Sequence, residues 1–141
     1  MAGKADFSEE EWKTMHRGVT GAGMLVSVSD AHFSETFGEA SALAKELRAE
    51  AEKSESQLVR ELAATGGTGF GLTTSRQEAE TETLAALKAA TALLASKAPD
   101  DEDPYRQLVL GVADAVAGAK GGVSQAETDA IAKIKDALGA A

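Results

Sequence analysis

Four helix-start signals spread along the chain constrain its fold more than any other feature. Three are S-x-x-E capping boxes, formed by Ser8 with Glu11, Ser75 with Glu78 and Ser124 with Glu127. In a capping box the serine hydroxyl and the glutamate carboxylate satisfy backbone N–H groups that the first helical turn leaves unpaired. The fourth signal is Asp103 followed by Pro104, which predicts an N-cap aspartate and a proline at the first helical position. The chain is therefore predicted to be mainly helical.

Apolar residues keep helical spacing after each of these signals. We expect helices over residues 9–28, 33–64, 76–97, 105–119 and 125–138, and the second is open to a break near residues 48–57. No segment alternates between apolar and polar residues, so no sheet is predicted. The residues that the spacing assigns to the core are Leu43, Leu47, Ala51, Leu58, Leu62, Leu84, Leu87, Thr91, Leu94, Val109, Val112, Ala113, Val116, Ile131, Ile134 and Leu138. The predicted fold class is all-α, a compact bundle of five to seven helices.

Composition favours a bundle and excludes several functions. Hydrophobic residues make up 43% of the chain but aromatic residues only 4%, so the core must consist of Ala, Leu, Val and Ile, which suits closely packed helices. The net charge of −9 argues against nucleic acid or an anionic membrane surface as a partner, because both are negative. The chain has no cysteine, which excludes thiolate nucleophiles and thiolate metal sites.

The length fits one domain, predicted to span residues 1–141, with a Gly-rich linker at residues 65–74 between two halves. A phosphate-binding loop is the alternative interpretation of this linker, since its glycines precede a helix start. The linker lacks the lysine of a Walker A loop, which favours a connector anchored by Phe70. The chain begins without an apolar signal core, and the uncharged stretch at residues 18–29 is too short to span a bilayer. We therefore expect a cytoplasmic protein without membrane insertion.

The segments at residues 18–47 and 111–138 share an outline. The matching pairs are Gly18 with Gly111, Val19 with Val112, Ala22 with Ala115, Leu43 with Ile134 and Leu47 with Leu138. This outline favours a diverged duplication, with two helical hairpins related by a pseudo-two-fold axis. The small residues among the pairs predict close helix approach. A chance match between two alanine-rich hairpins is the alternative.

The loop AKGGVSQAE, residues 119–127, resembles the A-D-G-x-V-S-x-x-E signature of the TerB-like tellurite-resistance family. The matching residues are Ala119, Gly121, Val123, Ser124 and Glu127, and the resemblance covers mainly residues 108–139. It implies an all-helical domain of about this length with an approximate internal two-fold axis and acidic positions that bind divalent cations. The chain departs from the signature at Lys120, which places a positive charge where a hard cation needs an oxygen ligand.

Five carboxylates are the candidate metal ligands that follow from this resemblance: Asp30, Glu35, Glu39, Asp114 and Glu127. The alternative is that Gly121 and Gly122 only turn the chain and Glu127 only caps a helix. Asp30, His32 and Glu35 also form a weaker candidate for a metal or acid–base cluster, against which Phe33 and Phe37 indicate a plain hairpin corner.

No catalytic residues and no cofactor are predicted. The two histidines, His16 and His32, both lie in the N-terminal quarter and offer few ways to build a catalytic base. The acidic runs at residues 9–11, 78–82 and 100–103 lie at predicted helix starts, where they complement the helix dipole, and the sequence leaves open whether they join into one face. We therefore expect a non-catalytic protein that binds a protein partner or forms a homodimer. The alternative is a divalent-cation-binding stress-response protein of the tellurite-resistance type.

Overall fold

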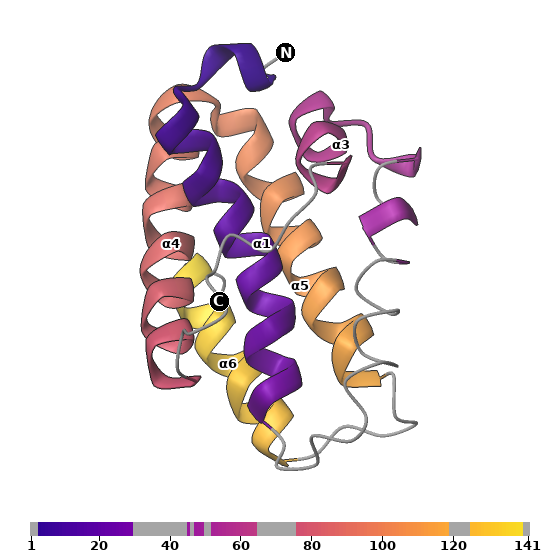
Figure 1. Ribbon diagram of the computed structural model, residues 1–141. Helices are drawn as coiled ribbons and strands as arrows, with labels where there is room; N and C mark the ends of the chain where they lie inside the picture. Colours follow the sequence, from indigo (N-terminus) through magenta and orange to yellow (C-terminus); the bar gives the residue numbers. More distant parts are fainter. Residues whose placement is uncertain are drawn as a thin grey trace.

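The computed structural model describes residues 3–29, 45, 47–49, 52–64, 76–118 and 125–139, and every regular element within these ranges is a helix (Figure 1). The α-helices are α1 (Glu9–Ser29), α3 (Gln57–Ala64), α4 (Arg76–Lys97), α5 (Glu102–Gly118) and α6 (Gln125–Leu138). Two short 3₁₀ helices, η1 (Lys4–Asp6) and η3 (Pro99–Asp101), precede α1 and α5. Residues 45, 47–49, 52 and 53 are also helical. The predicted all-α class is confirmed.

Helix α1 lies at the centre of the bundle, in contact with α4, α5 and α6 (Figure 1). Residues 18–23, with the sequence GVTGAG, are all buried, so the middle of this helix is covered on every side. A helix that is enclosed all round cannot keep a charged face. The enclosure explains why the long uncharged stretch of the sequence begins at Gly18.

A tyrosine of α5 fixes the distance between α1 and α5. Tyr105 is fully buried, and its hydroxyl donates a hydrogen bond of 2.8 Å to the carbonyl oxygen of Met15. A Cβ atom at position 18 would overlap this hydroxyl and lie 3.0 Å from Leu87 Cδ2. Gly18 thus makes room for the side chains of Tyr105 and Leu87, and the predicted close approach of whole helices at the small residues stays a prediction. Burial also raises the pKa of the Tyr105 hydroxyl above its ordinary value.

The helix boundaries follow the sequence signals closely, with one correction. The Ser8–Glu11 capping box is present, since Ser8 N–H donates to Glu11 Oε1 at 2.7 Å and Glu11 N–H donates to Ser8 Oγ at 3.1 Å. Ser75 and Ser124, the caps of the other two boxes, lie outside the described residues.

The prediction of Asp103 as an N-cap is wrong. Helix α5 begins at Glu102, two residues before the predicted first helical position at Pro104, because the turn of η3 that starts at Pro99 leads directly into it. Asp103 lies inside the helix, and its carboxylate accepts a hydrogen bond from Arg106. Pro104 remains within the first turn, where its missing N–H costs no hydrogen bond.

The predicted helix over residues 33–64 is broken at residues 54–56, within the stretch that the sequence left open. Ser56 starts α3 anew, because its hydroxyl accepts a hydrogen bond of 3.2 Å from Val59 N–H. The same hydroxyl donates to Asp101 Oδ1 at 2.8 Å, which joins the start of α3 to η3. Helix α3 accordingly lies beside the first half of α5 (Figure 1).

The core contains most of the predicted residues. Those confirmed as buried are Leu58, Leu62, Leu87, Thr91, Leu94, Val109, Val112, Ala113, Ile134 and Leu138, while Leu47, Leu84 and Ile131 are partly buried. Leu43 and Ala51 and the side chain of Val116 lie outside the described part of the chain. The core also holds side chains that the spacing did not assign to it, among them Phe7, Trp12, Met15, Tyr105 and Leu108.

Several predictions fall wholly or partly on residues that the structure does not describe. The linker at residues 65–74 with Phe70 is one, and the loop of the first predicted hairpin is another. The second hairpin is present, because α5 and α6 run in opposite directions and pack together (Figure 1). The duplication therefore stays a prediction. Within the described ranges, no helix combines the length and apolar character needed to cross a bilayer.

One buried hydroxyl in α4 lacks a hydrogen bond and gives a test of the packing. Thr83 is fully buried, and its Oγ1 has no partner among the described residues. Thr83→Val keeps the shape and removes the buried polar group, so we expect the free energy of unfolding to rise by about 1 kcal/mol. Thr91→Val is the matched control, because Thr91 Oγ1 donates to the carbonyl oxygens of Leu87 and Lys88. Chemical denaturation measures both, and a Thr83→Val variant no more stable than Thr91→Val contradicts the assignment.

Candidate functional site

The predicted metal ligands are only partly placed. Asp30, Glu35 and Glu39 lie outside the described residues, as do Lys120 and His32. Asp114 is exposed on α5, and Glu127 belongs to the first turn of α6. Among the residues that the structure describes, no three His, Asp or Glu side chains form a group that would hold a metal ion. The predicted ligand set stays a prediction.

His16 faces the interior of the bundle. It lies on α1 next to Met15, and only 7% of its surface is exposed. Its carbonyl oxygen accepts a hydrogen bond of 3.1 Å from the hydroxyl of Thr20 one turn later. The imidazole is therefore enclosed by the helices that surround α1, and it does not lie in a surface site.

Two of the three acidic runs lie at one end of the bundle. The run at residues 9–11 starts α1 and the run at residues 100–103 leads into α5, whereas the run at residues 78–82 starts α4 at the opposite end (Figure 1). They do not join into one face.

Lys97, at the end of α4, binds Glu11 Oε1 at 2.8 Å and lies 5.6 Å above the ring of Phe7. This hydrogen bond, with a second from Ser8 N–H, lowers the pKa of Glu11 below its ordinary value.

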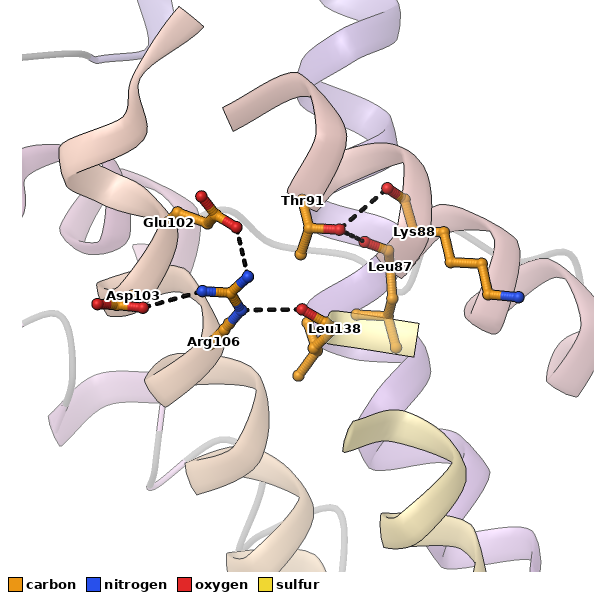
Figure 2. Close-up of polar contacts among 7 residues, drawn as sticks. All are labelled: Leu87, Lys88, Thr91, Glu102, Asp103, Arg106 and Leu138. Carbon is orange, nitrogen blue, oxygen red and sulfur yellow. Dashed lines mark hydrogen bonds and ion pairs between the residues drawn. The ribbon is translucent and has the colours of Figure 1, made fainter. Parts of the chain in front are cut away.

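A surface groove of about 310 Å³ opens between α4, the start of α5 and the end of α6. It is lined by Lys88, Thr91, Ala92 and Ala95 of α4, Glu102 and Arg106 of α5, and Asp136, Ala137, Leu138 and Gly139 of the α6 end. Figure 2 shows Arg106 between the two acidic residues of its own helix and the carbonyl oxygen of Leu138. No sequence motif had marked this groove, because its walls come from three separate segments.

Arg106 holds the end of α6 against the start of α5. Its Nε donates to the carbonyl oxygen of Leu138 at 2.8 Å, its Nη1 donates to Asp103 Oδ1 at 2.9 Å, and its Nη2 contacts Glu102 (Figure 2). A cation at a helix C-terminus satisfies an orphan carbonyl and complements the helix dipole. Gly139, with a φ of 71°, ends α6 in the left-handed conformation that favours glycine. Arg106 is thus already occupied by structural contacts.

The outer face of α4 carries small apolar side chains. Ala85, Ala89, Ala92 and Ala95 are all exposed, and their spacing places them on one side of the helix. The opposite side is buried against α1 and α6, through residues such as Leu87 and Leu94. Ala92 and Ala95 also line the groove, so the alanine face and the groove are continuous. We refer to these four alanines together with the groove as the α4 surface.

The α4 surface escaped sequence analysis for a physical reason. Alanine has the highest helix propensity of all residues, so an alanine in a helical segment is compatible with the core, with solvent and with a docking face. One signal of this surface was present in the sequence. Residues 85–95 contain more alanines than the buried face of α4 holds.

Comparisons with known proteins give no relative: no family model matches the chain, and no curated protein or solved structure shows significant similarity to it.

Proposed function

We propose that this chain is a non-catalytic, cytoplasmic protein that acts by binding another protein, with the α4 surface as its contact. The observation that carries the proposal is the continuity of the exposed alanine face with the groove. Methyl side chains allow a second helix to approach α4 closely, since the distance between packed helices depends on the side chains at their contact. A helix laid along α4 reaches the groove at Ala92 and Ala95.

Charged groups around the α4 surface support docking over catalysis. Lys88 and Asp136 are exposed at the groove, where they offer polar contacts beside the alanine side chains. The guanidinium of Arg106 donates hydrogen bonds to Glu102, Asp103 and the carbonyl oxygen at the end of α6. Its N–H donors are therefore used in contacts that stabilise the fold. These features favour an interface that combines alanine contacts with polar ones.

Site-specific photo-crosslinking in cells tests this proposal. A benzoylphenylalanine at position 89 is expected to give a discrete covalent adduct, because that position lies in the middle of the α4 surface. Ala132 is the matched control, since it is an exposed alanine on α6. An adduct of twice the mass of the chain would identify a homodimer as the partner complex. Equal adducts from positions 89 and 132, or none from position 89, would overturn the proposal.

Divalent-cation binding of the tellurite-resistance type is the second candidate, and one feature of the fold favours it. Helices α1 and α5 end, and α6 begins, at the same end of the bundle (Figure 1). Asp30 directly follows the last residue of α1, and Glu127 lies in the first turn of α6. This topology supports the expectation, drawn from the TerB-like resemblance, that carboxylates of two hairpins converge.

Thermal unfolding of the EDTA-treated protein with Mg²⁺, Ca²⁺, Mn²⁺ or Zn²⁺ distinguishes the two candidates. If this candidate is right, one cation at 100 times its dissociation constant stabilises the fold by about 2.7 kcal/mol. Asp30→Ala is then expected to abolish the shift, and Lys120→Asp to lower the concentration at which the shift begins, because it restores an oxygen ligand. An unchanged melting temperature for every cation, in both the wild type and Lys120→Asp, would exclude this function.

A further inference from the structure

We draw no further inference here: the strongest candidate, the acidic end of the bundle formed by residues 9–11 and 100–103, is a cluster of carboxylates in contact with Ser56, Lys97 and Arg106 of the same chain, and no second feature of the described residues points to a ligand.

Discussion

Gly18→Ala is expected to lower the free energy of unfolding by about 2 kcal/mol. The added methyl group would overlap the Tyr105 hydroxyl and crowd Leu87. Both neighbours are fully buried and have no room to move, so we assign the overlap a cost of about 3 kcal/mol. Alanine has a higher helix propensity than glycine, which offsets about 1 kcal/mol of the cost of the overlap. Thermal unfolding measures the loss as a fall in Tm of about 8 °C for a domain of this size.

Tyr105→Phe supplies the control for this prediction. On its own it removes the hydrogen bond to Met15, at a cost of about 1 kcal/mol. In its presence the alanine at position 18 no longer meets the hydroxyl, so the cost of Gly18→Ala should fall below about 1 kcal/mol. The same cost in both backgrounds would show that the Tyr105 hydroxyl does not set the spacing of α1 and α5.

Leu94→Ala is expected to lower the free energy of unfolding by about 3 kcal/mol, because it removes a fully buried side chain and leaves a cavity in the core. Its neighbour Leu93 is only partly buried, so Leu93→Ala should cost about 1 kcal/mol. The two substitutions are chemically identical and one residue apart. Urea unfolding of both variants therefore reports which face of α4 is turned to the core.

Losses of equal size at positions 93 and 94 would contradict this orientation of α4. They would also remove the basis for the α4 surface, because the alanine face is defined as the side opposite to Leu87 and Leu94. The pair of variants thus tests the fold and the geometry of the candidate site together.

Local interactions explain how much of this fold could be predicted from the sequence. The capping box of Ser8 and Glu11 joins residues three apart, and its hydrogen bonds form as the pattern requires. Helical spacing likewise assigned the buried faces of α4, α5 and α6. The residues of one helix face recur every three or four positions, so the apolar residues of a buried face can be recognised in the sequence. The bounds of α4 and α6 followed from these signals alone.

Contacts between distant residues explain what the sequence did not reveal. The hydrogen bond from Tyr105 to Met15 joins residues 90 apart, and that from Ser56 to Asp101 joins residues 45 apart. The side chain of Arg106 makes a predictable pair with Glu102 one turn earlier, but its hydrogen bond to Leu138 depends on how α5 and α6 pack. The candidate site was missed for the same reason, since the groove exists only where α4, α5 and α6 meet.

Size-exclusion chromatography of native cell extract tests the central claim most directly. If the α4 surface binds a protein, the wild-type chain elutes in a complex larger than its own 14.5 kDa. Ala89→Arg should then elute at the mass of the free chain, while the matched variant Ala132→Arg remains in the complex. Circular dichroism and Tm of the purified variants establish that both are folded. Elution of the wild type and Ala89→Arg at the same position, whether in a complex or as the free chain, would contradict the proposed interface.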